Sequence, residues 1–410
     1  MNESILSKLL MTARVPYTRE VVRQASRRRC GQILDELSPT LRSQPPFVVA
    51  QVVGTNGKGS TAAMVAHGLG RVGARRSVGM YTSPHLEQLA ERIRVDGRPI
   101  SDAVLEPLLR EILAAEQQLD VQLSGFGRLT VAALLHFVDA GCKTVILEAG
   151  LGARYDATTA MPAELVLFSR FGLDHAHELG DSVAAVAADK AEALRPTVRA
   201  FSVTQEPVAE QILRTRAQEG GLQLEFVTPA ERAPEGLPGP HQRDNAALAL
   251  AGLRVLEADA QPSWLDGVRW AGRLERIVRG RGVAWLDVAH NVDGAHALTQ
   301  SMVNLGVVPH VVVFGVTVDK RPEQMLEILR RQWPTSRFWL VPPLKRKAMV
   351  PRELALAGER VFSSPTSTLM LSGLDNVLDS GGVVLICGAH TVVGPARIRL
   401  RDPRPLHAPR

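Results

Sequence analysis

The chain has 410 residues, more than one hydrophobic core usually supports, so two domains are expected. Hydrophobic residues make up 45% and charged residues 22%, which excludes a disordered or coiled-coil chain, and no apolar run reaches the ~18 residues that a membrane helix needs. The net charge of +6 suits an acidic small molecule, whereas nucleic acid is not expected because the few aromatic residues (4%) are not interleaved with the basic ones.

The first half of the chain alternates strand-like runs with helical patterns. The strand-like runs are short and rich in β-branched residues, and they lie at 47–53, 78–81, 144–148 and 165–168. Helical patterns occupy 61–69, 129–138 and 183–194. This alternation predicts βαβ units and a mainly parallel sheet.

The same alternation restarts in the second half of the chain. Strand-like runs lie at 283–286, 311–314, 338–341 and 383–386, and Pro322 marks the first turn of a helix. Between the halves, an Ala/Leu-rich helix at 245–256 is followed by the polar, proline-containing stretch 258–266. We therefore predict two α/β domains, 1–269 and 270–410.

The strongest local signal is the run Gly-Thr-Asn-Gly-Lys-Gly-Ser at 54–60, which follows a strand and opens a helix. Its glycines allow the backbone to approach an anion, and the N–H groups at the helix start can bind phosphate. Lys58 would add a positive charge, and Ser60 a hydroxyl for Mg²⁺. The run does not match the usual P-loop spacing, so a glycine-rich turn without a ligand is the alternative.

Further candidates stand at or near the ends of predicted strands. Glu148 ends an apolar strand, and Asp287 and His290 follow another, where side chains face the ligand crevice of a parallel sheet. For Glu148 the alternative is an N-cap or a surface charge, and for Asp287 and His290 it is a turn with Asn291. Taken alone, His175 is typical of a structural histidine and Lys190 of a solvated lysine on an Ala-rich helix.

Motifs along nearly the whole chain resemble those of the folylpolyglutamate synthase and dihydrofolate synthase family, within the Mur ligase superfamily. In chain order they are the loop at 54–60, Tyr-Thr-Ser-Pro-His-Leu at 81–86, Glu-Arg-Ile-Arg-Val at 91–95, Leu-Glu-Ala-Gly-Leu-Gly-Ala-Arg-Tyr-Asp-Ala-Thr at 147–158, Gly-Leu-Asp-His at 172–175, Asp-Lys-Ala at 189–191, His-Gln at 241–242 with Asn245, Gly-Arg-Leu-Glu at 272–275, Leu-Asp-Val-Ala-His-Asn at 286–291, and 388–394. The pattern departs from the family at Gly127, where the family has Glu, and at Thr159, where it has Asn.

The resemblance implies a fold and a reaction. It implies an N-terminal P-loop-like domain with a mainly parallel sheet, and a smaller C-terminal α/β (Rossmann-like) domain that closes over the nucleotide. The reaction would use ATP to activate the carboxylate of a folate or dihydropteroate as an acyl phosphate, which L-glutamate then attacks. The protein would be a cytoplasmic monomer, and its three cysteines, Cys30, Cys142 and Cys387, fit a reducing compartment.

The resemblance also implies roles for individual residues. The catalytic residues would be Lys58, Glu148, His175 and Lys190. The residues that bind ATP would be Gly54, Thr55, Asn56, Gly57, Lys58, Gly59, Ser60, Thr61, Asn245, Arg273, Asp287 and His290. Two Mg²⁺ sites would use Ser60, Glu148 and His175, with a carbamylated Lys190 in support. The acid substrate would contact Ser83, Arg92, Phe126, Arg154 and Asp156.

Two other functions stay open on the sequence. A Mur-type amide ligase could act on a different acid, such as a secondary metabolite or a cell-wall precursor, and Gly127 and Thr159 favour that alternative. A nucleotide-binding regulator without turnover is the other, and the joint presence of Lys58, Glu148, His175 and Lys190 argues against it.

Overall fold

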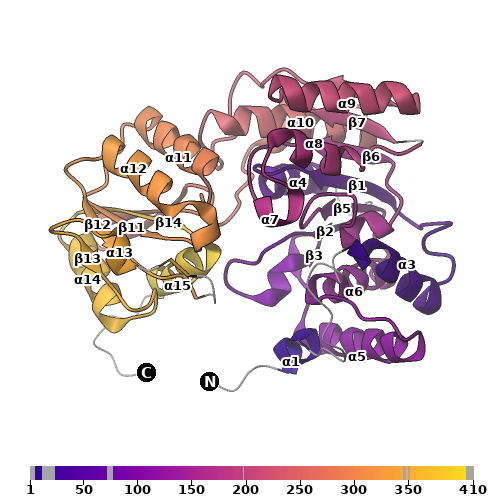
Figure 1. Cartoon of the computed structure of the whole chain (residues 1–410), viewed down its shortest axis with the longest axis horizontal. Coiled ribbons are helices and arrows are strands. Elements are labelled where there is room, and N and C mark those ends of the chain that lie inside the picture. Colours follow the sequence, from indigo (N-terminus) through magenta and orange to yellow (C-terminus); the bar gives the residue numbers. More distant parts are fainter. Residues whose placement is uncertain are drawn as a thin grey trace. The chain divides into compact units, whose positions relative to one another are not determined.

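The computed structural model describes residues 5–11, 24–71, 77–196, 198–344, 348–349 and 351–402 (Figure 1). The chain divides into two compact units. Unit 1 comprises Met1–His85, Leu89–Glu231 and Asp244–Asp266, and unit 2 comprises Leu86–Gln88, Arg232–Arg243 and Gly267–Arg410. The sequence did not anticipate that 86–88 and 232–243 would belong to unit 2, and the boundary at 269/270 stays a prediction.

Unit 1 is built on an eight-stranded sheet with the order β4-β3-β2-β5-β1-β6-β7-β8. The strands β2, β5, β1, β6, β7 and β8 are parallel, and β3 and β4 pair antiparallel at one edge. The strands are β1 (Val48–Val53), β2 (Val78–Tyr81), β3 (Ile93–Val95), β4 (Arg98–Pro99), β5 (Thr144–Glu148), β6 (Leu165–Phe168), β7 (Arg199–Ser202) and β8 (Gln223–Phe226).

Helices surround this sheet and bury its apolar side chains in separate clusters. One cluster joins α3, α5 and α6 to strands β1, β2 and β5, and another joins α8 and α9 to β6 and β7. The helices are α1 (Ile5–Met11), α3 (Ser26–Leu37), α4 (Lys58–Gly70), α5 (Asp102–Gln118), α6 (Gly125–Asp139), α7 (Ala176–Leu179), α8 (Val183–Ala191), α9 (Pro207–Gly220) and α10 (His241–Leu256), with 3₁₀ turns η1 (Leu89–Arg92), η2 (Ala157–Ala160) and η3 (Pro262–Leu265).

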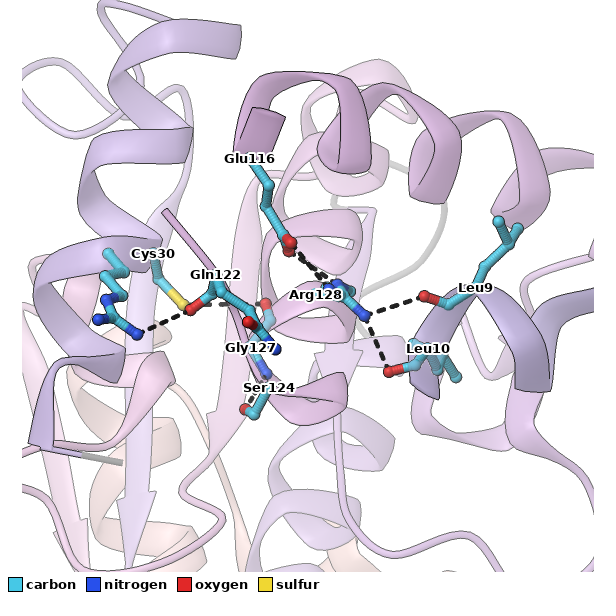
Figure 2. Close-up of polar contacts among 9 residues, drawn as sticks. Leu9, Leu10, Cys30, Glu116, Gln122, Ser124, Gly127 and Arg128 are labelled. Atoms are coloured by element: carbon cyan, nitrogen blue, oxygen red, sulfur yellow. Dashed lines mark hydrogen bonds and ion pairs between the residues drawn. The ribbon is translucent and has the colours of Figure 1, made fainter. Parts of the chain in front are cut away.

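A buried ion pair joins three of these helices (Figure 2). Arg128 of α6 donates from Nε and Nη2 to the two carboxylate oxygens of Glu116 on α5, at 2.7 and 2.8 Å. Its Nη1 donates to the carbonyl oxygens of Leu9 and Leu10 near the end of α1, each at 3.0 Å. These contacts satisfy a guanidinium that is only 1% exposed, and they fix α1 against α6.

Unit 2 holds a six-stranded sheet with the order β13-β12-β11-β14-β10-β9. It is parallel except for β9, which pairs antiparallel with β10. The strands are β9 (Glu275–Arg279), β10 (Gly282–Asp287), β11 (Val311–Gly315), β12 (Arg337–Leu340), β13 (Arg360–Val361) and β14 (Val383–Gly388). Two mainly parallel α/β sheets confirm the fold class expected from the sequence.

Helices cover both faces of this second sheet (Figure 1). Alternate residues of β11 show this, because Val311 and Val313 pack with α14 and α15, whereas Val312 and Phe314 pack with α11 and α12. The helices are α11 (Val292–Asn304), α12 (Pro322–Gln332), α13 (Pro351–Leu354), α14 (Thr368–Asp379) and α15 (His390–Arg401), with the 3₁₀ turn η4 (Val318–Lys320). None of the helices in the described ranges is long and apolar enough to cross a membrane.

Several helices differ in extent from the sequence prediction. Helix α4 begins at Lys58 and not at 61, and α10 begins at His241 and not at 245. Helix α8 ends at Ala191, whereas the prediction extended it to 194. The early start of α4 matters for function, because it places Lys58 and Ser60 in the first turn of a helix.

Candidate active site

The loop at 54–60 leaves the carboxyl end of β1 and turns into α4. Gly57 precedes the helix with a φ of 92°, a conformation that favours glycine, and a Cβ there would lie 2.3 Å from Oδ1 of Asn245. Asn245, on α10, is therefore packed against the loop. The loop is also tied to the segment after β6, because the N–H groups of Thr55 and Asn56 both donate to the carbonyl oxygen of Arg170.

Lys58, Ser60 and Thr61 lie in the first turn of α4. The Nζ of Lys58 donates to the carbonyl oxygen of Thr55 at 3.1 Å, so its charge lies over the loop. Ser60 and Thr61 are buried, and the Oγ1 of Thr61 has no hydrogen-bond partner in the structure. The positive end of the helix dipole and the charge of Lys58 both favour an anion such as phosphate at this end of α4.

Lys190 lies beneath the same loop. Its side chain is only 3% exposed, and its Nζ donates to the carbonyl oxygen of Gly54 at 2.8 Å. Burial and the nearby charge of Lys58 lower the pKa of Lys190 from 10.5 to about 7, against the opposing effect of Asp189 and other carboxylates. The interpretation of Lys190, taken alone, as a solvated lysine is therefore wrong, and its surroundings favour the neutral amine more than those of an exposed lysine do.

Glu148 ends β5 beside the start of the loop. Strands β1 and β5 are paired so that Val52 lies opposite Glu148, two residues before Gly54. The buried carboxylate accepts a hydrogen bond at Oε2 from the N–H of Ser83, at 2.9 Å. Arg92 lies close enough for Glu148 to raise the pKa of its guanidinium, although burial has the larger, opposite effect. The structure thus brings Glu148, Ser83 and Arg92 together.

Asp156 holds the glycine-rich segment that follows β5. Its Oδ2 accepts from the N–H groups of Gly150 and Leu151 at 3.0 and 2.9 Å, and its Oδ1 accepts from the N–H and the Oγ1 of Thr158 at 3.0 and 2.6 Å. Burial raises the pKa of the Asp156 carboxyl, and these donors act in the opposite direction. Its four hydrogen bonds all stay within its own loop, so it shapes the segment that the predicted substrate contacts occupy.

Asp189 holds the same segment from the other side, and the sequence analysis did not include it in the site. Its Oδ1 accepts from the N–H of Ala153 at 2.8 Å and from the N–H of Arg154 at 3.4 Å. The sequence signals for Asp189 were its place beside Lys190 and within the Asp-Lys-Ala motif at 189–191. The Arg154 side chain itself is exposed and lies 3.7 Å from Glu192.

Phe126 stands at the start of α6 and packs on the glycine-rich segment. Its ring centroid lies 5.5 Å from that of Tyr81, and a Cβ on Gly150 would lie 2.6 Å from its Cζ. The next residue, Gly127, faces away toward α3 (Figure 2). A Cβ there would lie 3.2 Å from Sγ of Cys30, so Glu, the family residue at this position, would meet α3 and not the site.

Thr159, the second departure from the family pattern, is also buried in local packing. Its Oγ1 donates within the glycine-rich segment, where the carbonyl oxygens of Ala153 and Asp156 lie at 2.9 and 2.7 Å. The hydroxyl is thus used to hold the backbone of the segment. In this structure Gly127 packs against α3 and Thr159 against its own segment.

His175 precedes α7 in the segment after β6. Its φ is 54°, its N–H donates to Oδ1 of Asp174 at 2.7 Å, and its ring is 41% exposed. The same segment is tied to the phosphate loop, because the N–H of Gly172 donates to Oγ1 of Thr55 at 3.1 Å. His175 therefore lies on a segment that is hydrogen-bonded to the loop at 54–60, and its left-handed backbone conformation is one that few residues adopt.

The remaining ATP candidates gather at the carboxyl end of β10 in unit 2. Asp287 accepts hydrogen bonds from the N–H groups of Leu274 and Ala289, at 2.7 and 2.8 Å. Burial raises the pKa of Asp287, whereas Arg273 and His290 act in the opposite direction. Nδ1 of His290 lies 2.8 Å from the carbonyl oxygen of Val288, which orients the ring.

His241 is a second candidate that the site prediction missed, although its motif was noted. Burial, and to a smaller degree Arg273, lower the pKa of His241 from 6.5 to about 4, so the ring is neutral at neutral pH. Its Nδ1 is buried and has no hydrogen-bond partner in the structure. A neutral ring with an unused nitrogen beside Arg273 is suited to hydrogen bonding with a ligand.

The oxygen donors near the phosphate loop fit a magnesium ion. A serine hydroxyl and a carboxylate are ligands that Mg²⁺ accepts, and it commonly keeps water and substrate phosphate in its other positions. The described residues hold no group of three or more His, Cys, Asp or Glu side chains that could bind a metal. The predicted set of Ser60, Glu148 and His175 contains only two such side chains, so it depends on other oxygen donors.

Comparison with known proteins gives matches over much of the chain, although no protein-family model matches it. The chain is 31% identical to a dihydrofolate synthase/folylpolyglutamate synthase of Bacillus subtilis over 316 residues, which cover 68% of this chain and 73% of the relative. It is 33% identical to a protein of the same description from Mycobacterium tuberculosis over 344 residues, covering 72% of this chain and 69% of the relative.

Solved structures extend the match to nearly the full length. The fold is similar to Mycobacterium tuberculosis folylpolyglutamate synthase complexed with ADP and AMPPCP, with a TM-score of 0.80, 27% identity, and coverage of 94% of this chain and 98% of the other. It is also similar to E. coli FolC in complex with DHPP and ADP, with a TM-score of 0.78, 26% identity, and coverage of 96% of both chains.

Proposed function

Because the chain belongs to the dihydrofolate synthase/folylpolyglutamate synthase family of ATP-dependent, amide-forming ligases, we propose that it joins L-glutamate to the carboxylate of a dihydropteroate or a folate. The observation that carries the proposal is that three groups lie together at the carboxyl ends of the central strands β1 and β5 of the first sheet. These are the phosphate loop, the carboxylate of Glu148 and the buried amine of Lys190. A phosphate-binding loop, a metal-binding carboxylate and a buried amine are groups that an ATP-dependent ligase can use to hold a triphosphate.

The phosphate loop would bind ATP and neutralise the charge that develops during transfer. Backbone N–H groups at the start of α4 would bind phosphate oxygens, and the ammonium of Lys58, which contacts the loop at Thr55, would add its positive charge. Transfer of the γ-phosphoryl group to the acid gives an acyl phosphate and ADP, and phosphoryl transfer depends on positioning and charge neutralisation. The amine of glutamate then attacks the acyl carbon, and phosphate leaves.

Mg²⁺ is the metal that the donor set fits. Ser60 and Glu148 would hold it, with His175 and a carbamylated Lys190 as candidates at a second position. When bound, Mg²⁺ would neutralise the negative charge of the phosphate oxygens. Lys190 supports the carbamate idea because its amine is buried, lies at Gly54 and has a lowered pKa, so a neutral nitrogen is available to react with CO₂.

The acid would lie along the segment that Asp156 and Asp189 shape. Phe126 would offer an aromatic surface above Gly150, and Ser83 and Arg92 would lie on the Glu148 side. We also propose that the protein acts as a monomer in the cytoplasm, where its three buried, free cysteine thiols would stay reduced.

A panel assay for ADP formation tests the proposal. The acids are dihydropteroate, tetrahydrofolate and chemically unrelated carboxylic acids, each supplied with and without L-glutamate. We expect ADP formation that needs both a pterin acid and glutamate. Turnover with an unrelated acid, and with neither of the two pterin acids, would indicate a Mur-type ligase of another specificity. The absence of turnover with every acid, in protein that binds ATP, would indicate a non-catalytic nucleotide binder.

A further inference from the structure

A short piece of the first half of the sequence is part of unit 2. Residues Leu86–Gln88 belong to unit 2, whereas His85 and Leu89 on either side belong to unit 1. Leu86 packs against an apolar cluster of unit 2. A Cβ on Gly394 of α15 would lie 2.0 Å from the carbonyl oxygen of Leu86, so only glycine allows this approach.

An ion cluster also holds residues 86–88 in unit 2, through the carboxylate of Glu87. Arg397 of α15 pairs with Glu87, and its Nε donates to Oε1 and Oε2 of Glu275, at 3.0 and 2.7 Å. The three side chains are 14%, 17% and 21% exposed, in the order Arg397, Glu87 and Glu275, so solvent screens the cluster only in part. Glu275 also accepts at Oε2 from the N–H of Gly272, at 3.0 Å.

The cluster therefore touches the predicted nucleotide site. Glu275 is two residues from Arg273, and the next residue after Arg273, Leu274, donates its N–H to Asp287. Arg273 and Asp287 are both candidates for binding ATP. If nucleotide binding moves residues 272–275, the carboxylate of Glu275 moves with them. Arg397 forms ion pairs with both Glu275 and Glu87, so the movement would reach Glu87.

The other end of the piece reaches the acid side of the site. The N–H of Ser83 donates to Glu148 at 2.9 Å, and the N–H of Thr82 donates to the carbonyl oxygen of Arg92, also at 2.9 Å. Three residues separate Ser83 from Glu87. This short stretch of backbone, which bends at 83–84 and at 86–87, is the covalent path by which a displacement of Glu87 would reach Ser83.

We propose that residues 83–87 are a tether that couples the nucleotide-binding segment 272–275 of unit 2 to Glu148 of unit 1, with Arg397 as the positioning residue. The assignment of the two ends to ATP and to the acid rests on the proposed function. The tether makes the presentation of Ser83 to Glu148 depend on whether unit 2 holds a nucleotide. It gives Glu87, Arg397 and Gly394 a role beyond packing within unit 2.

The first experiment uses hydrogen exchange and needs no turnover. Amide exchange of the peptide that covers 82–88 is followed with and without ADP, in the parent and in Glu87→Gln, which keeps the shape of the side chain and removes its charge. We expect ADP to slow exchange in this peptide of the parent. In Glu87→Gln, we expect the ADP effect to fall by about fivefold or more, which corresponds to a modest coupling energy.

Asp375→Asn is the matched control. Asp375 accepts from Arg399, on the same helix as Arg397, at 2.7 Å, and from Arg279 at 3.1 Å. The substitution perturbs a partly buried ion cluster of unit 2, and this cluster makes no described contact with 86–88. The variant should therefore keep the ADP effect on 82–88. Equal loss of the effect in both variants would show general loosening of unit 2 and overturn the tether.

Steady-state kinetics give the second readout. Glu87→Gln should raise the KM for the acid at saturating ATP by about fivefold or more, and because coupling is reciprocal, it should also raise the KM for ATP at saturating acid. Asp375→Asn should change neither KM. Gly394→Ala should act in the same direction as Glu87→Gln, since its new Cβ displaces Leu86. An acid KM equal to that of the parent in both Glu87→Gln and Gly394→Ala would overturn the proposal. A parent that shows the ADP effect but forms no amide would instead overturn the proposed function.

Discussion

Two lysines contact the backbone of the phosphate loop, and their surroundings give them different properties. Lys58 is half-buried at the start of α4 and donates to Thr55. Lys190 is buried, donates to Gly54 and has a pKa lowered to about 7 by burial and by Lys58. Burial therefore favours the neutral form of the second amine more than in an ordinary lysine.

Replacing Lys58 by Ala should remove catalysis without unfolding the protein. The lost charge on the phosphates should reduce kcat by about 10²–10³-fold, the usual effect of removing one donor to a developing negative charge. The measurement is ADP formation under saturating substrates, with thermal unfolding as a check on the fold. Lys143→Ala, at an exposed lysine, is the control and should behave like the parent. Near-parental ligation by Lys58→Ala would refute the assignment of the loop.

Replacing Lys190 by Arg should also abolish activity, because arginine keeps a positive charge and cannot form the carbamate. Below pH 7 the Lys190 amine is protonated and cannot react with CO₂, so parental activity should rise with pH through about 7. Removal of dissolved CO₂ should lower activity, and bicarbonate should restore it. Bicarbonate should have no effect on Lys190→Ala. Full activity in Lys190→Arg would end the carbamate hypothesis.

Replacing Asp156 by Asn should affect the acid substrate before ATP. Asn replaces one carboxylate oxygen with an NH₂ group, which cannot accept the hydrogen bonds that this oxygen now accepts from backbone N–H groups. Leaving such N–H groups unpaired lowers the unfolding free energy by about 1–3 kcal/mol. The glycine-rich segment would lose its shape, and the KM for the acid should rise well before that for ATP. Asp35→Asn, at an exposed ion pair with Arg42, is the control. Equal effects on both KM values would place Asp156 in a different role.

At the scale of elements, α1 is fastened to α5 and α6 by one buried guanidinium. Arg128 uses both carboxylate oxygens of Glu116 and two carbonyl oxygens near the end of α1 (Figure 2). A Cβ on Gly125, the first residue of α6, would lie 3.2 Å from the carbonyl oxygen of Leu10. The end of α1 therefore lies against the same turn of α6 that carries Phe126.

Replacing Glu116 by Gln should destabilise unit 1 strongly. The change leaves the Arg128 charge buried and only partly paired, which typically costs about 3–5 kcal/mol. Denaturant titration of the parent and the variant measures the difference. The control is Glu106→Gln, which breaks the exposed pair with Arg110 on the same helix and should cost no more than about 1 kcal/mol. Similar losses in both variants would mean that the buried pair adds no stability of its own.

At the scale of the whole molecule, the residues assigned to ATP are divided between the two units. The phosphate loop and Asn245 belong to unit 1, whereas Arg273, Asp287 and His290 belong to unit 2. If one ATP molecule uses both sets, the molecule should become more compact when ATP analogue and acid are bound, which also excludes water from the acyl phosphate.

Small-angle X-ray scattering tests this expectation. The radius of gyration should decrease with a non-hydrolysable ATP analogue and an acid together. It should decrease less in Glu87→Gln if the 83–87 tether contributes to the change. An unchanged radius with saturating ligands would argue against a ligand-dependent rearrangement of the units.

The sequence by itself determined the α/β class, the strand–loop–helix setting of residues 54–60 and the strand-end position of Glu148. These features depend on short-range patterns: the alternation of strands and helices, glycines where a loop turns into a helix, and a carboxylate at the end of an apolar run. The ordered motifs also identified the family, which the comparisons confirm.

Only the tertiary structure decided which side chains are buried and what they contact. The burial of Lys190 against Gly54 and the use of Asp156 within its own loop depend on packing between segments that are distant in sequence or folded back on themselves. The docking of 86–88 into unit 2 depends on Arg397, more than three hundred residues later. Periodicity describes which face of an element is apolar, but it does not specify which partner that face or charge will meet.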